Sequence, residues 1–343
     1  MSLMRKSMRL LATAGAMALG LGLATACGGG DTETAATAPA SPQGGGSAFP
    51  VTLTHKLGTT TIKAAPQRIV ALGEVDQDTL LALGVQPVGM AELTGIQPDG
   101  LTPWTAPKLA GAKPTLLKAG ESGFSVEQIA ALKPDLILAG GDYYIDKEYA
   151  NLSQIAPTTA YQTGPAEDSW QTIAKQVAQA IGKPAEGDRL VADVEAKIAS
   201  VKTTYPELSG KEFALTSVFP SGNIGVLKSE TDISNKLFGE FGMVLPEAIK
   251  QLPGEGFAAE LSMEKIGVLD VDLLFSHYND DPATQKKIEG NKLFAGLDVV
   301  KRGSYVPLDL KAFWPLRTPT PLAIPYVIDN VVPEAAKAAK AAG

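Results

Sequence analysis

The chain has 343 residues, of which 45% are apolar and 20% are charged, so it can build packed cores and exceeds the size of one small domain. Its two histidines and single cysteine exclude a metal site rich in His and Cys, and they disfavour a histidine-dependent catalytic triad. With 30 basic and 37 acidic residues the formal charge is −7, which argues against a nucleic-acid-binding protein.

The first 26 residues have the layout of an export signal. Three basic residues, Arg5, Lys6 and Arg9, precede an uncharged stretch that is too short and too rich in Gly and Ala to predict a membrane-spanning helix. Small residues then lead to Cys27, and this junction resembles a bacterial lipoprotein box, although Ala24 stands where leucine is usual. The resemblance implies that Cys27 is lipidated and becomes the first residue of the mature chain. The alternative is an ordinary cleaved signal followed by an incidental cysteine.

Residues 27–48 consist mainly of Gly, Ala, Thr, Ser and Pro, which cannot bury enough apolar surface to fold. We expect a flexible tether with a root-mean-square reach of about 25 Å. Loss of residues 1–26 leaves 27 basic and 37 acidic side chains, a formal charge of −10. The lone thiol is then used by the anchor, so no disulfide supports the body. We expect a monomer at the extracytoplasmic face of the plasma membrane, held there by lipid.

From Phe49 onward, short apolar runs alternate with helical patterns, which is typical of an α/β protein with largely parallel sheets. The predicted strands are 68–72, 87–90, 135–139, 158–161, 212–218, 271–276 and 304–308. Ser125 followed by Gln128 fits a capping box, and Ser169 precedes a second predicted helix over 170–181. A long amphipathic pattern predicts a third helix from about Pro184 to Tyr205.

A segment of 14 residues recurs after 137 positions. Residues 125–138 and 262–275 share six identical positions, and each copy predicts a capped short helix, a turn and a buried strand. A repeat at this distance indicates two related lobes, one on each side of the predicted 184–205 helix. Helix–turn–strand units often look alike, which is the alternative explanation.

Several segments, in their order along the chain, resemble the periplasmic iron-siderophore, haem and cobalamin binding proteins that serve ABC importers. The resemblance covers residues 49–343 and rests on 58–62, 66–72, 80–85, 87–89, 129–137 and 152–157. Residues 76–84 and 104–111 look most like the actinobacterial ferric-siderophore branch. The resemblance implies an α/β fold of two Rossmann-like lobes joined by a single long helix, with the ligand cleft between the lobes. Here the lobes are 49–183 and 206–343, and the connecting helix is 184–205.

In this family one glutamate at the tip of each lobe pairs with arginines of the membrane permease, which itself works with an ATPase. The matching motifs place these docking residues at Glu127 and Glu264. Each follows a predicted helix N-cap, where the helix dipole favours an exposed carboxylate. Helix stability alone is the alternative explanation for both.

The ligand implied is an iron(III)-siderophore complex, which brings its own iron-coordinating oxygens, so the protein needs neither metal ligands nor a cofactor. Flat aromatic side chains, here called plates, and a few hydrogen-bond donors are enough to bind such a complex. The candidates lie in loops that follow predicted strands: Trp104, Tyr143, Tyr144, Tyr278 and Trp314 as plates, and Arg317 as a forked donor. Alternatively, the tyrosines cap the edge of the core and Arg317 pairs with a carboxylate. His277 is interpreted as a polar lining residue.

Acidic residues predominate in the first-lobe loops: Glu74, Asp76, Glu92, Asp99, Asp142 and Asp146. Their charge favours a neutral or cationic ferric hydroxamate over an anionic ligand such as ferric dicitrate. An enzyme is disfavoured because the chain lacks a phosphate-binding glycine loop, a Gly-x-Ser-x-Gly elbow and a His-Glu-x-x-His motif. A haem or cobalamin binding protein of the same fold and a non-transport envelope module remain open.

Overall fold

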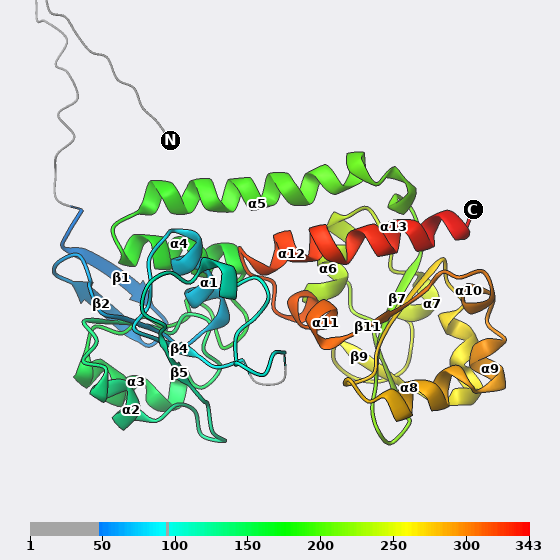
Figure 1. The fold of residues 1–343 in the computed structure, drawn as a ribbon, viewed down its shortest axis with the longest axis horizontal. Helices are drawn as coiled ribbons and strands as arrows, with labels where there is room; N and C mark the ends of the chain where they lie inside the picture. Colours follow the sequence, from blue (N-terminus) through cyan, green and yellow to red (C-terminus); the bar gives the residue numbers. More distant parts are fainter. Residues whose placement is uncertain (1–47, 94–95) are drawn as a thin grey trace, which may run out of the picture. The chain divides into compact units, whose positions relative to one another are not determined.

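The computed structural model describes residues 48–93 and 96–343, which contain two β-sheets and a separate two-stranded hairpin (Figure 1). The predicted signal, Cys27 and nearly all of the predicted tether lie outside the described residues. No helix in the described ranges is both long enough and apolar enough to cross a membrane.

The first sheet is parallel and has the order β5-β4-β3-β6. Its strands are β3 (Ile69–Ala71), β4 (Gly89–Ala91), β5 (Thr115–Leu117) and β6 (Leu136–Leu138). The helices of this part are α1 (Glu74–Ala82), α2 (Val126–Ala131), α3 (Ile145–Ile155) and α4 (Trp170–Ala180). We call the part built on this sheet the first lobe. From β3 the chain continues to β4 and then β5 on one side of β3, and afterwards it forms β6 on the other side of β3. The order of the strands therefore reverses between β3 and β6.

A hairpin beside this sheet was not predicted. Strands β1 (Val51–His55) and β2 (Gly58–Ile62) pair antiparallel, and Gly58 adopts φ +147°, which favours glycine. The backbone N–H of Lys56 donates to the Tyr161 carbonyl at 3.0 Å. The predicted strand 158–161 forms only an isolated bridge between Thr158 and Ile137, because much of its hydrogen bonding goes to the hairpin and to side chains.

The second sheet is mixed, which corrects the expectation of largely parallel pairing. In the order β11-β10-β7-β8-β9, the first three strands are parallel and the last two pair antiparallel. The strands are β7 (Phe213–Val218), β8 (Ile224–Leu227), β9 (Ala258–Leu261), β10 (Leu273–His277) and β11 (Tyr305–Leu308). The tight turn after β7, with Gly222 at φ +88°, returns the chain as β8. We call this part the second lobe.

The helices of the second lobe are mostly short. They are α6 (Ile233–Glu240), α7 (Glu247–Lys250), α8 (Pro282–Glu289), α9 (Lys292–Ala295), α10 (Asp298–Lys301), α11 (Leu310–Arg317), α12 (Ala323–Asn330) and α13 (Val332–Ala341). Three 3₁₀ segments occupy Ala106–Lys108, Pro206–Leu208 and Met263–Leu269.

The predicted long helix is present as α5 (Pro184–Thr204), which packs on α4 and on α12 (Figure 1). A Cβ on Gly187 would lie 2.2 Å from the Ala178 Cβ, so glycine permits the close approach of α5 to α4. On the other side, the Lys197 Nζ lies 2.9 Å from the Asp329 carboxylate of α12. Helix α5 thus contacts helices of both lobes.

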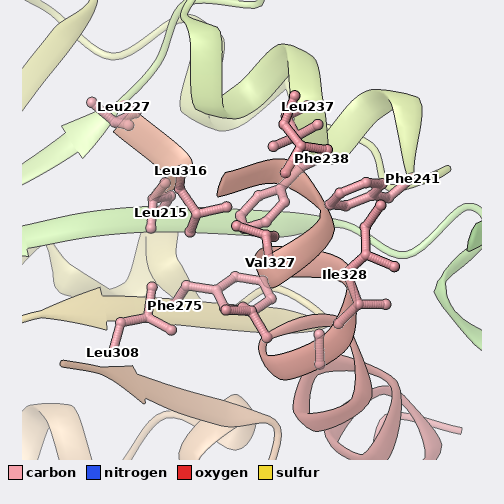
Figure 2. Packing of buried hydrophobic residues seen from close by; sticks show 14 of the residues in the cluster. Leu215, Leu227, Leu237, Phe238, Phe241, Phe275, Leu308, Leu316, Val327 and Ile328 are labelled. Atoms are coloured by element: carbon pink, nitrogen blue, oxygen red, sulfur yellow. The ribbon is translucent and has the colours of Figure 1, made fainter. Parts of the chain in front are cut away.

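The main core is continuous from the first sheet through α4 and α5 into the second lobe. Figure 2 shows its second-lobe part, where Phe238 of α6 lies among Phe275 of β10 and Val327 and Ile328 of α12. The Phe238 ring centre is 5.1 Å from that of Phe213 and 4.8 Å from that of Phe275. A second cluster lies on the other face of the first sheet.

The two copies of the sequence repeat fold differently at their helix starts. In the first copy the Ser125 side chain accepts a hydrogen bond from the Gln128 N–H, so the predicted capping interaction is confirmed. The second copy is the 3₁₀ segment Met263–Leu269, and Ser262 makes no side-chain cap. The expectation of two capped helices is therefore wrong for the second copy.

Candidate functional site

A cavity of about 550 Å³ is lined by residues of both lobes. The first lobe contributes Glu74, Val75, Gly140, Gly141, Ala166, Asp168, Trp170 and Ile173, and the second lobe contributes Thr231, Asp232, Ile233, Phe257, Arg317, Thr318 and Pro319. Glu74 and Gly140 follow the carboxyl ends of β3 and β6, the two strands between which the strand order reverses. Ligands of open α/β sheets bind at such a switch point, and the volume suits a small organic ligand.

Glu74 begins α1 and reaches across to the second lobe. Its carboxylate accepts a hydrogen bond from the Trp314 indole N–H at 2.9 Å. Desolvation raises the pKa of Glu74 to about 8; the bond from Trp314 opposes this shift, and the nearby Asp78 charge adds to it. Glu74 is therefore mainly a neutral carboxyl group at pH 7, and it brings little negative charge to the cavity.

Arg317 lies at the end of α11, lines the cavity and is already paired. Its Nη1 donates to both carboxylate oxygens of Asp232 at 2.7 Å, and to the Ser234 hydroxyl at 2.9 Å. Asp232 in turn accepts the backbone N–H of Ser234 at 3.0 Å as the N-cap of α6. The Phe257 ring centre is 5.5 Å from the guanidinium carbon. Arg317 thus lines the cavity and pairs with a carboxylate, and its role as a donor to the ligand stays a prediction.

Two of the predicted aromatic plates lie away from this cavity. Trp104 is buried, its indole N–H donates to Asp78 at 3.0 Å, and its ring lies 5.1 Å from that of Tyr326. Tyr278 is buried, and its hydroxyl accepts from Tyr305 at 2.9 Å. Both polar groups are satisfied within the protein, which explains why these side chains point into the fold.

The other three aromatic candidates occupy intermediate positions. Trp314 is half-buried and is joined to the cavity through its bond to Glu74. Tyr143 is 69% exposed and meets the edge of Tyr144 with ring centres 5.7 Å apart. Tyr144 is half-buried and precedes α3. All three remain candidates for ligand contact.

A second hollow of about 370 Å³ lies wholly within the second lobe. It is lined by Tyr278, Asp280, Pro282, Gln285, Pro307, Leu308 and Asp309, at the carboxyl ends of β10 and β11. His277 is buried nearby, with Nδ1 3.0 Å from the Leu308 carbonyl and its ring stacked 4.3 Å from Phe313. It lines neither hollow, contrary to its interpretation as a lining residue.

The acidic loop residues of the first lobe are mostly structural. Asp76 is fully buried and accepts the backbone N–H groups of Gly140 and Gly141 at 3.1 and 2.7 Å. Among the six acids named from the sequence, Glu74 is the one that lines the cavity. The sequence-based charge argument therefore loses most of its support, because the other five carboxyl groups do not face a ligand there.

Asp168, Asp232 and Phe257 are among the lining residues that were not singled out from the sequence. Asp168 accepts two backbone N–H groups, of Gln162 at 2.5 Å and Thr163 at 2.9 Å. Asp232 could have been found as a helix cap, since it precedes an apolar helical run. Phe257 is 55% exposed in a loop between α7 and β9, and no local pattern marks it.

The two predicted docking residues are both accessible. Glu127 is exposed on α2, and the Ser125 hydroxyl donates to its carboxylate at 2.9 Å. Hydrogen bonds from its own backbone N–H and from Ser125 lower the pKa of Glu127. Glu264 is exposed in the 3₁₀ segment. Both carboxylates are available to a cationic partner.

No cluster of three or more His, Cys, Asp or Glu side chains suited to a metal ion exists in the described ranges 48–93 and 96–343. The cavity instead offers aromatic surface from Trp170 and Phe257, glycine backbone and a few carboxyl groups. This arrangement suits binding of a preformed complex, and it contains no nucleophile paired with a histidine base.

Comparison with known proteins agrees with this geometry. Residues 69–310 match the periplasmic binding protein family. The probable siderophore-binding lipoprotein YfiY of Bacillus subtilis is 28% identical over 270 residues, covering 75% of this chain and 80% of that protein. A crystal structure of a periplasmic solute binding protein from Mycobacterium smegmatis is 32% identical, with TM-score 0.73 and coverage of 84% of this chain and 98% of that one.

A third similar protein was solved with a ligand. PiaA of Streptococcus pneumoniae in complex with ferrichrome is 28% identical, with TM-score 0.70 and coverage of 85% of this chain and all of that one. Proteins of this family bind a substrate and do not transform it, so the expectation that the chain is not an enzyme is confirmed. The expected two-lobed α/β architecture is likewise confirmed. With its match across 69–310, the chain belongs to the periplasmic binding protein family, in the group of iron-siderophore binding proteins that serve ABC importers.

Proposed function

We propose that this protein is an extracytoplasmic lipoprotein that captures a ferric siderophore of the hydroxamate type in the inter-lobe cavity and delivers it to an ABC permease. The observation that carries the ligand class is the pairing of Arg317 with Asp232. Arg317 is the one cationic side chain among the described lining residues, and its charge is already balanced by the Asp232 carboxylate, to which its Nη1 donates.

The other charged groups of the cavity support the same ligand class. Asp168 places a carboxyl group in the cavity lining, while Glu74 is mainly neutral at pH 7. An anionic citrate complex would meet the Asp168 carboxyl group, which has no cationic partner, and an arginine whose charge Asp232 already balances; this is unfavourable in a partly desolvated cavity. A neutral or cationic hydroxamate complex meets no such cost, and Trp170 and Phe257 offer it apolar surface.

Haem is a weaker candidate on this geometry. The two histidines of the chain, His55 and His277, are both buried, and neither lines the cavity. An axial histidine for haem iron is therefore missing at this site.

The ligand class is tested by titrating the full chain with ferrichrome, ferrioxamine B, ferric dicitrate, haem and cobalamin while following tryptophan fluorescence. Trp170 lines the cavity and Trp314 adjoins it, so occupation changes the emission. We expect ferrichrome or ferrioxamine B to bind at least about tenfold more tightly than ferric dicitrate. Tighter binding of ferric dicitrate would overturn the hydroxamate proposal.

Docking is proposed to use Glu127 and Glu264. Glutamine at both positions is expected to leave ferrichrome affinity unchanged and to lower uptake more than either single change, since an interfacial charge pair costs about 2–5 kcal/mol when one partner is truncated. Lys311, an exposed residue of α11, gives a control variant, Lys311→Gln. Wild-type uptake by the stably expressed double variant would refute the docking roles.

Membrane attachment is proposed to use lipidated Cys27. Cys27→Ala should release the protein from the membrane fraction, because a lipid anchor requires the thiol. Unchanged retention would contradict this role. Transport assays with the released variant then show whether attachment is needed for delivery.

A further inference from the structure

Two carboxyl groups of α1 join the first lobe to the second. Glu74 and Asp78 are four residues apart, so they lie on one face of the helix. Glu74 accepts from Trp314 of α11, and Asp78 accepts from the Thr320 hydroxyl in the segment between α11 and α12. Both bonds connect positions about 240 residues apart in the sequence.

The two contacts differ in their surroundings. Asp78 is fully buried, and the oxygen that accepts from Thr320 also accepts from the Trp104 indole at 3.0 Å. No part of Asp78 lines the cavity. This contact is enclosed on all sides and is inaccessible to a ligand.

Glu74 is half-buried, and it lines the cavity beside Val75 and Gly141. Among the described lining residues, Glu74 is the one whose side chain forms a hydrogen bond with the other lobe, through Trp314. Asp168 is the informative contrast, since this lining carboxylate bonds only to backbone groups of its own lobe.

We propose that Glu74 is a positioning residue through which an occupied cavity acts on the junction between the lobes, whereas Asp78 is a fixed anchor. This inference rests on the proposed function, because it takes the ligand to be a hydroxamate siderophore in this cavity. A ligand N–H or ammonium group that bonds to the Glu74 carboxyl competes with Trp314 for its oxygens. The bond to Trp314 is thereby weakened, while the bonds of Asp78 to Trp104 and Thr320 stay in place.

The three tryptophans allow a direct test. In the full chain labelled with ¹⁵N at tryptophan, each indole N–H gives one resonance, and Trp314→Phe identifies that of Trp314. Without ligand, Glu74→Ala is expected to move the Trp314 resonance, and the matched variant Asp168→Ala is expected to leave it in place. An unmoved Trp314 resonance in Glu74→Ala would refute the contact by itself.

Ligand coupling is tested with gallium(III) ferrichrome, which lacks the paramagnetism of iron. Titration of the wild-type chain should shift the Trp314 resonance in step with binding and leave that of Trp104 unmoved. Trp314→Phe keeps an aromatic ring but loses the donor, so the affinity for gallium ferrichrome should rise about threefold to tenfold. A Trp104 shift as large as that of Trp314, or an unchanged affinity of Trp314→Phe, would overturn the coupling.

The two proposals fail in different ways. Absence of binding of both gallium ferrichrome and gallium ferrioxamine B by the wild-type chain would refute the proposed function, and the coupling with it. Binding with the wild-type affinity but without any movement of Trp314 would refute the coupling alone.

Discussion

The two lobes differ in the side chains that they bury: the first lobe buries several carboxyl groups, and the second lobe buries several phenylalanine rings. Asp76, Asp78, Asp142 and Glu148 are all nine-tenths or more buried, and burial raises the pKa of each. The buried Asp232 of the second lobe is paired with Arg317. Burial of a carboxyl group without a cation reduces stability, so these groups lower the stability of the first lobe, while the aromatic core contributes strongly to that of the second.

The largest expected effect comes from the aromatic core. Phe238→Ala should lower the free energy of unfolding by about 3–5 kcal/mol, since the ring is fully buried against Phe213 and Phe275. Thermal unfolding measures this loss. Phe219, which is 48% exposed, gives the control Phe219→Ala, for which we expect less than a quarter of the effect. Equal losses would contradict the stabilising role of this core.

A smaller effect is expected at the anchor between the lobes. Asp78→Ala leaves the Trp104 indole and the Thr320 hydroxyl without their acceptor, at a cost of about 1–3 kcal/mol for each buried donor that stays unpaired. Asp78→Asn keeps an acceptor oxygen and should lose less. Denaturant unfolding compares the two variants, and equal stability of Asp78→Ala and wild type would show that the contact is dispensable.

The third effect is a dependence of stability on pH. Desolvation and the nearby Asp142 raise the pKa of Glu148 from 4.5 to about 7, so the folded state holds its proton when the unfolded state has lost it. Stability therefore falls as pH rises from about 4.5 to 7, by up to about 1.4 kcal/mol per pH unit for one such group. Glu148→Gln should flatten this slope in melts taken between pH 4.5 and 8. An unchanged slope would remove Glu148 from the explanation.

Local patterns predicted the long helix and the parallel strands other than β5, which was missed, while the predicted strand 158–161 forms only an isolated bridge. A buried apolar run such as 135–139 and the amphipathic pattern of 184–205 can each be recognised from consecutive residues alone. Both predicted elements are present, as β6 and α5. Strands β8 and β9 were missed because Gly225 interrupts the first and Glu260 the second. Strand β9 pairs with β8 across residues 228–257, a separation too long for a local sequence pattern to reveal the pairing.

The site was harder to predict than the fold. The sequence predicted ligand contacts in loops that follow strands, and two residues after strands β3 and β6, Glu74 and Gly140, line the cavity. The burial of Trp104 and Tyr278 was not predicted, because loop position does not determine whether an aromatic side chain faces solvent or the core. Their inward orientation depends on Asp78 and Tyr305, which lie 26 and 27 residues away in the sequence.

The most direct measurement asks which of the two hollows holds the ligand. Thr231→Trp fills the inter-lobe cavity from its exposed rim, whereas Gln285→Trp fills the hollow inside the second lobe. Calorimetric titration of both variants with ferrichrome is expected to show at least about a tenfold loss of affinity for Thr231→Trp and wild-type affinity for Gln285→Trp. Loss of binding in Gln285→Trp with full binding in Thr231→Trp would contradict the assignment of the inter-lobe cavity as the siderophore site.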